Sequence, residues 1–228
     1  MSKPNRTPTT PPAPAIRTRV MVAAIAGFVV IAGVVAVAVS RNDRSGSDRA
    51  AAVAGGSTLS PDAAGEIRPV RVAGPALERQ KAGTDPAVGT AAPVLTGSTF
   101  TGDATDTTPV AGRRRLLVFL AHWCPHCRRE VPRLVKWAAA GGVPDDVDVT
   151  AIATATAIDR DNYPPSAWLA REKLPFPVLV DDAAGTAASS FGLNGFPFLV
   201  LVNADGTVAA RASGEKELDE LSAFAAAG

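Results

Sequence analysis

The distribution of apolar and polar positions divides the chain into four segments. Residues 1–19 are rich in Pro and Thr, and residues 20–39 are apolar or Gly throughout. Residues 40–86 are rich in Ala, Gly, Ser and Pro and contain no aromatic residue. Strand and helix patterns begin at about residue 87. The pattern therefore predicts a basic tail, a long apolar helix, a flexible linker and one globular domain over 87–228.

The apolar run 20–39 is long enough to cross a membrane. Its twenty residues would rise about 30 Å as an α-helix, which matches the hydrocarbon core of a bilayer. The tail before it contains basic but no acidic residues, which favours a cytoplasmic N-terminus. The alternative is a signal peptide cleaved near Ala36-Val37-Ala38, although the run is longer than most such signals. The sequence thus predicts a single-pass cell-membrane protein with an extracytoplasmic domain or, after cleavage, a secreted protein.

Within residues 87–228, strand-like and helix-like segments alternate. The apolar run 116–121 is typical of a strand buried on both faces, and residues at helical spacing follow it up to Gly141 and Gly142. Residues on either side of Gly97 give a weak hairpin signal. The remaining pattern predicts strands at 147–158, 177–180, 198–202 and 207–211 and helices at 164–173, 182–191 and 213–227. This order predicts an α/β sandwich around a central mixed sheet.

Composition and charge exclude several classes of protein. The 23 basic and 22 acidic side chains leave a net charge of +1, which argues against nucleic acid as a partner. Two cysteines are too few for a disulfide-stapled scaffold or a four-cysteine zinc site. One group of basic residues forms either a solvated surface or a patch that steers an acidic partner: Arg113, Arg114, Arg115, Arg128, Arg129, Arg133 and Lys136.

Both cysteines and both histidines lie in one motif between a predicted strand and a predicted helix. The motif reads His122-Trp123-Cys124-Pro125-His126-Cys127. A helix N-terminus carries partial positive charge and free N–H groups, so it stabilises a thiolate. We therefore expect Cys124 to be an exposed nucleophile and Cys127, one turn further, to close a disulfide with it. The predicted redox group is this pair, with no organic cofactor and no metal.

The two residues between the cysteines influence the direction of exchange. Pro125 fixes φ and lacks an N–H, whereas His126 favours the Cys124 thiolate if it is protonated or donates a hydrogen bond. A stabilised thiolate makes the disulfide a stronger oxidant, which favours oxidation or isomerisation of substrates. A metallochaperone that binds copper or zinc through the two cysteines and His122 or His126 is the alternative function.

These residues resemble the thioredoxin superfamily, and within it the TlpA/ResA-like extracytoplasmic thiol–disulfide oxidoreductases. The resemblance covers residues 87–228. It rests on three groups of residues: Trp123 with the Cys124–Cys127 motif, Glu130 with Pro132, and Gly195-Phe196-Pro197 before a strand. The Pro-His dipeptide between the cysteines looks more like that of the oxidase DsbA, so the direction of electron flow stays open. Phe196 is bulkier than the residue common at that place.

The resemblance implies a thioredoxin-like sandwich and a role for each of these residues. Cys124 would attack a substrate disulfide and Cys127 would resolve the mixed disulfide. Pro197 would be in cis beside the dithiol, and Glu130 would perturb its ionisation. Three residues would contact the substrate: Trp123, Gly195 and Phe196. The implied partners are cysteine-containing exported proteins and a redox protein that recycles the dithiol, while residues 20–39 would hold the protein in the membrane.

Overall fold

The computed structural model describes residues 65–81 and 83–227. The predicted tail (1–19) and membrane helix (20–39) lie outside the described residues. Within the part of the chain that is described, no helix is both long and apolar enough to span a membrane.

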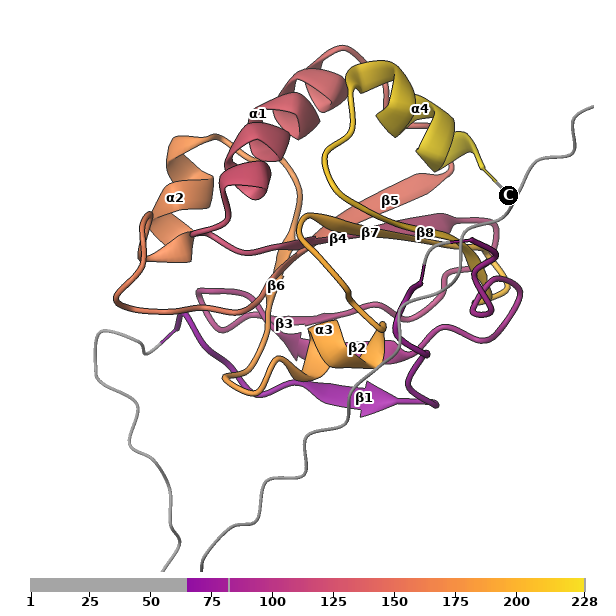
Figure 1. Ribbon diagram of the computed structural model, residues 1–228, viewed down its shortest axis with the longest axis horizontal. Coiled ribbons are helices and arrows are strands. Elements are labelled where there is room, and N and C mark those ends of the chain that lie inside the picture. Colours follow the sequence, from indigo (N-terminus) through magenta and orange to yellow (C-terminus); the bar gives the residue numbers. More distant parts are fainter. Residues whose placement is uncertain (1–64, 82, 228) are drawn as a thin grey trace, which may run out of the picture. The chain divides into compact units, whose positions relative to one another are not determined.

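A five-stranded mixed sheet forms the centre of the domain, in the order β6-β5-β4-β7-β8 (Figure 1). Strands β4 (Arg114–Leu120), β5 (Val147–Ala153) and β6 (Val178–Val180) run parallel to one another. Strands β7 (Phe198–Val202) and β8 (Val208–Ser213) are antiparallel to their neighbours. The central strand, β4, lies between β5 and β7, where layers on both faces bury the side chains of residues 116–120. The predicted mixed sheet is therefore confirmed.

Three helices cover one face of this sheet (Figure 1). They are α1 (Pro125–Ala139), α2 (Pro165–Arg171) and α4 (Leu218–Ala226). Every second residue of β4, starting with Leu116, packs into the apolar cluster beneath them, together with Trp137 of α1. This packing fixes the start of α1 directly after the carboxyl end of the central strand, which is where the cysteine motif lies.

The opposite face is covered by a short helix and a small sheet (Figure 1). The helix is α3 (Thr186–Ser190). The small sheet is antiparallel, in the order β1 (Arg71–Ala73), β2 (Val94–Ser98) and β3 (Ala104–Asp106). The β4 side chains that point to this side, such as Phe119, pack in a second apolar cluster with residues of α3 and β2.

The folded domain begins earlier than the sequence predicts. The linker is expected to reach residue 86, but the structure places residues 65–81 and 83–86 in the domain. Strand β1 of this segment pairs with β2, and Glu66 accepts hydrogen bonds from the backbone N–H (2.9 Å) and the hydroxyl of Ser166. Val70, Val72 and Leu77 of this segment also pack on the second apolar cluster. The apolar residues are few and the segment is rich in Ala, Gly and Pro, so its composition resembles that of a linker.

Three predicted elements differ from the observed ones. β2 runs through Gly97 instead of turning there, and a Cβ at this position would lie 3.4 Å from the side chain of Leu179. Glycine therefore permits the close approach of the two sheets. The strand predicted over 147–158 ends with β5, and the helix predicted over 182–191 is shortened to α3. Before α3, the Asp181 carboxylate accepts hydrogen bonds from the backbone N–H groups of Ala187 and Ala188. The side chain of Asp181 therefore caps the first turn of this helix.

Candidate active site

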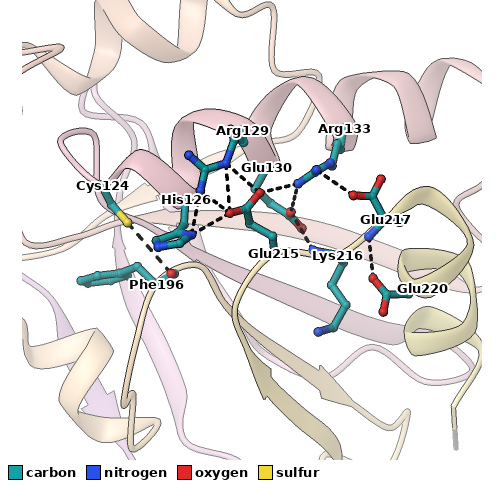
Figure 2. A network of polar contacts seen from close by, with 10 residues as sticks. All are labelled: Cys124, His126, Arg129, Glu130, Arg133, Phe196, Glu215, Lys216, Glu217 and Glu220. Atoms are coloured by element: carbon teal, nitrogen blue, oxygen red, sulfur yellow. Dashed lines mark hydrogen bonds and ion pairs between the residues drawn. The ribbon is translucent and has the colours of Figure 1, made fainter.

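The two cysteines lie at the N-terminus of α1. Cys124 is the N-cap residue, Cys127 lies in the first turn, and both are free thiols. Cys127 is fully buried, and its Sγ accepts a hydrogen bond from the Ala121 backbone N–H at 3.5 Å. Cys124 is 6% exposed, and its thiol faces the Phe196 carbonyl oxygen at 4.0 Å (Figure 2). The expectation of an exposed Cys124 is therefore wrong: the loop that contains Phe196 covers most of it.

The surroundings of the second cysteine disfavour its ionisation. Burial is the main cause that raises the pKa of the Cys127 thiol, and negative charge on Cys124 and Glu130 adds to it. Cys127 is thus held as a neutral thiol, while Cys124 keeps the residual access to solvent. The two sulfurs differ in the way that a nucleophile and a resolving thiol need to differ.

A cis-proline loop lies against the dithiol. The peptide bond between Phe196 and Pro197 is cis, as the resemblance implies. The Pro197 carbonyl accepts a hydrogen bond from the Gly214 N–H at 2.9 Å, which fixes the loop to the end of β8. Gly195 precedes this loop at half-burial. The structure thus brings Phe196, which lies between Gly195 and Pro197, to Cys124, although 72 residues separate the two in sequence.

Trp123 forms a wall beside the first cysteine. Its ring meets the ring of Phe196 edge-on, with 6.0 Å between the ring centroids. Its Nε1–H donates to the Ala155 carbonyl at 2.8 Å, and the Arg160 guanidinium lies 5.1 Å from the ring centroid. Ala155 has a φ of 51°, a strained conformation for a non-glycine residue, of the kind found at functional sites.

His122 fixes the loop around residues 155–161, which contacts Trp123. It is buried, its Nδ1 donates to the Asp161 carbonyl (2.7 Å), and its Nε2 accepts from the Ala157 N–H (3.1 Å). Desolvation by burial lowers the pKa of His122, which matches a neutral ring with its proton on Nδ1. Both nitrogens that would bind a metal ion are occupied by the backbone. Among the residues that the structure describes, no three His, Cys, Asp or Glu side chains are grouped to hold a metal ion.

The sequence did not predict the carboxylate that contacts His126. Glu215, in the loop between β8 and α4, lies 2.6 Å from each of three α1 side chains: His126, Arg129 and Arg133 (Figure 2). The hydrogen bonds from Arg129 and then from His126 lower the pKa of Glu215 to about 2. In the sequence, Glu215 stands in a short run of acidic and basic residues before the last helix. Such a run does not indicate that Glu215 contacts a residue 89 positions away.

Glu130 is buried within α1. Its Oε2 accepts the Lys216 backbone N–H at 2.9 Å, and Arg133 is 3.9 Å away. Burial raises the pKa of Glu130 to about 7, although the Lys216 hydrogen bond and the Arg133 charge act in the opposite direction. The resemblance implies that Glu130 perturbs the dithiol, and its charge does contribute to the raised pKa of Cys127. Pro132, the other residue of this part of the motif, lies inside the helix.

Replacement of Glu130 by Gln should remove one pH dependence of stability. The pKa of Glu130 is about 7 in the folded state against 4.5 ordinarily, so the folded state binds a proton more tightly than the unfolded state between these values. The free energy of unfolding of the wild type should therefore fall as pH rises from 4.5 to about 7. It should fall by about 3 kcal/mol more than that of Glu130→Gln. Denaturant unfolding of both full-length proteins under reducing conditions at several pH values measures the difference. A difference that does not change with pH would contradict the assignment.

Known proteins resemble the domain in family and in fold. Residues 87–227 match the Redoxin family. No curated protein matches the sequence. A thiol:disulfide interchange protein of the thioredoxin family from Chlorobium tepidum TLS has a TM-score of 0.50 and 20% identity, over 62% of this chain and 97% of that chain.

Two further solved structures are similar. StoA from Bacillus subtilis has a TM-score of 0.49 and 22% identity, over 61% of this chain and 98% of that chain. A secreted Mycobacterium tuberculosis disulfide oxidoreductase homologous to E. coli DsbE has a TM-score of 0.48 and 28% identity, over 57% of this chain and 93% of that chain.

The family match and the architecture agree. The matched residues span more than half of the chain and include the cysteine motif and the cis-proline loop. The likeness to the Chlorobium protein supports a thioredoxin-like fold with a mixed central sheet. The chain therefore belongs to the Redoxin family.

Proposed function

We propose that this protein exchanges disulfides with cysteines of exported proteins, as a TlpA/ResA-like enzyme held at the outer side of the cell membrane. The protein is a thiol–disulfide oxidoreductase, and its redox group is the Cys124–Cys127 pair. One observation carries the proposal: two thiols lie at the start of a helix beside a cis-proline loop. The Cys127 thiol is fully buried, whereas Cys124 keeps a small exposed area.

The exchange proceeds in two balanced steps. The Cys124 thiolate attacks one sulfur of a substrate disulfide, so that a bond to this sulfur forms, the substrate S–S bond breaks, and the other sulfur leaves with the electron pair and takes a proton. Cys127 then loses its proton and attacks Cys124, which closes the Cys124–Cys127 disulfide and releases the second substrate thiol. Two electrons have moved from the protein to the substrate. Oxidation of a substrate dithiol is the same sequence in reverse.

Residues around the dithiol position the substrate. The backbone of Gly195 and Phe196 would pair with an extended segment of the substrate, and Pro197 would exclude water from the sulfurs. Trp123, with Arg160 on its ring, forms the opposite wall. Pro125 and His126 lie between the two cysteines, and the contact between His126 and Glu215 places a proton-binding group at the mouth of the site. The position of the dithiol at the start of α1 supports an oxidising or isomerising role, because the partial positive charge of a helix N-terminus favours the reduced pair.

The location follows from the sequence. Residues 20–39 would anchor the protein, with residues 1–19 in the cytoplasm and the domain outside it. In an oxidising compartment, a chain with two cysteines has no other thiol that could compete with the pair. A redox protein of the envelope would return the pair to its working state.

The reduction potential of the full-length protein tests the proposal. We expect a potential above the roughly −270 mV of thioredoxin, because Cys124 is the N-cap residue of α1 and the free N–H groups and partial positive charge of a helix N-terminus favour the dithiol. Equilibration with glutathione buffers gives this value, and exchange with a reduced unfolded protein or with insulin shows the activity. A potential as low as that of thioredoxin would contradict the oxidising role. Absence of exchange in both directions would contradict the function itself.

A further inference from the structure

A cavity opens between α1 and α2, next to the dithiol. Its volume is about 560 Å³, and Pro125, Arg128 and Arg129 line it from α1. Arg171 and Glu172 line it from the end of α2, which lies beside the first half of α1 (Figure 1). Since Pro125 directly follows Cys124, a polypeptide joined to Cys124 can pass from the sulfur into this cavity.

The cavity carries a positive charge that the protein only partly neutralises. Three guanidinium groups face one carboxylate, that of Glu172. Arg129 is already bound to Glu215. Arg128 is half exposed, and Asp161, at 3.8 Å, is 82% exposed, so this ion pair is weak. The side chain of Arg171 donates to a neutral group, Oδ1 of Asn162, at 3.2 Å.

Other arginines of the domain are bound more tightly. Those at Arg113, Arg114, Arg133 and Arg211 have a carboxylate oxygen within 2.7 Å. Arg128 and Arg171 differ from them: both are exposed and face the cavity, the ion pair of Arg128 is long, and the side chain of Arg171 donates to an amide oxygen. Two exposed guanidinium groups can bind new carboxylates at little cost, because the contacts that they give up are long or neutral.

We infer that this cavity binds an acidic segment of the protein substrate, next to the cysteine that reacts with Cys124. The inference rests on the proposed exchange function and names its substrate class. The four residues from Cys124 to Arg128 rise about 6 Å along the helix, which an extended chain spans in about two residues. Carboxylates two or three positions from the substrate cysteine would therefore reach Arg128, and those further along would reach Arg171. The pairing accelerates encounter and orients the substrate for attack.

Matched peptides test this inference on the full-length protein. Each peptide carries one disulfide, with either Glu or Lys at the second and third positions from the cysteine. We expect kcat/KM to be about tenfold higher for the Glu peptide at low ionic strength, and the ratio to fall as salt is added. The double variant Arg128→Glu/Arg171→Glu should reverse the preference, and Arg128→Gln/Arg171→Gln should remove it. The ratio of the two rates cancels any change in the reactivity of Cys124.

A control separates the cavity from the overall charge of the protein. Arg71→Glu reverses one arginine charge on the exposed edge strand β1, on the other layer of the domain, as Arg171→Glu alone does at the cavity. Arg71→Glu should leave the ratio unchanged, whereas Arg171→Glu should lower it. Equal rates for the two wild-type peptides, or a preference that survives in the double Glu variant, would overturn the inference. Failure to exchange with either peptide and with a small uncharged disulfide would instead contradict the proposed function.

Discussion

Replacing Cys124 with Ser should abolish disulfide exchange, with a loss of at least about a thousandfold in kcat/KM. A hydroxyl does not ionise at neutral pH and cannot form the S–S bond of the first step. Cys127 cannot replace it, because it is fully buried and its raised pKa keeps it protonated. Insulin reduction or oxidation of an unfolded protein by the full-length variant measures the loss.

Cys127→Ser provides the matched control, because it removes the same atom from the second step only. Cys124 still attacks in this variant, but no thiol resolves the product. We therefore expect a stable mixed disulfide with substrate, visible on a non-reducing gel and lost on adding reductant, and its absence from the double Cys124→Ser/Cys127→Ser variant. Substantial turnover by Cys124→Ser would show that another group starts the reaction.

The pattern of the sequence predicted the centre of the fold because the centre is apolar and regular. The run at 116–121 contains the last five of the seven residues of β4, and their burial on both faces is what such a run indicates. The placement of Cys124 and Cys127 at the start of α1 followed from this strand. The cis bond before Pro197 is visible in the sequence only through a family motif, since apolar periodicity contains no information about peptide isomers.

Features built from polar contacts were not predictable in the same way. Glu215 reaches His126 and Arg129 across 89 and 86 residues of sequence, and nothing in its local pattern names these partners. The cover over Cys124 depends on the Phe196 loop, which lies 72 residues later in the sequence. A local pattern of apolar and polar residues indicates which face of a helix or strand is buried. The contacts of Glu215 and of the Phe196 loop form only when segments far apart in the sequence come together in the folded protein.

Arg211 shows how a polar contact can fix a segment that composition assigns to a linker. Its side chain is fully buried in β8. The guanidinium donates through Nε to the Asp85 carboxylate (2.8 Å) and through Nη1 to the carbonyls of Glu78 (2.9 Å) and Phe191 (2.8 Å). One cation therefore satisfies a carboxylate and two backbone carbonyls, and it joins the segment before residue 87 to the central sheet and to the end of α3.

Arg211→Met should consequently destabilise the protein by about 3–5 kcal/mol at neutral pH, because it leaves a mostly buried carboxylate and two carbonyls without their partner. The hydrogen bond from Arg211 is the main cause that lowers the pKa of Asp85 from 3.8, so this stabilisation is present above that value and is lost as pH falls through the lower, folded-state pKa. Urea unfolding of the reduced full-length protein should show a difference from wild type that shrinks below about pH 4.

The matched control for Arg211 is an arginine of the same segment on the surface. Arg79 is exposed, and its long hydrogen bond to the Asn194 carbonyl, at 3.4 Å, contributes little. Arg79→Met should change the free energy of unfolding by less than about 0.5 kcal/mol. If Arg211→Met cost no more than Arg79→Met, the buried ion pair would not be what holds Glu78 and Asp85 on the domain. The apolar contacts of Leu77 with the second cluster would then have to hold this segment.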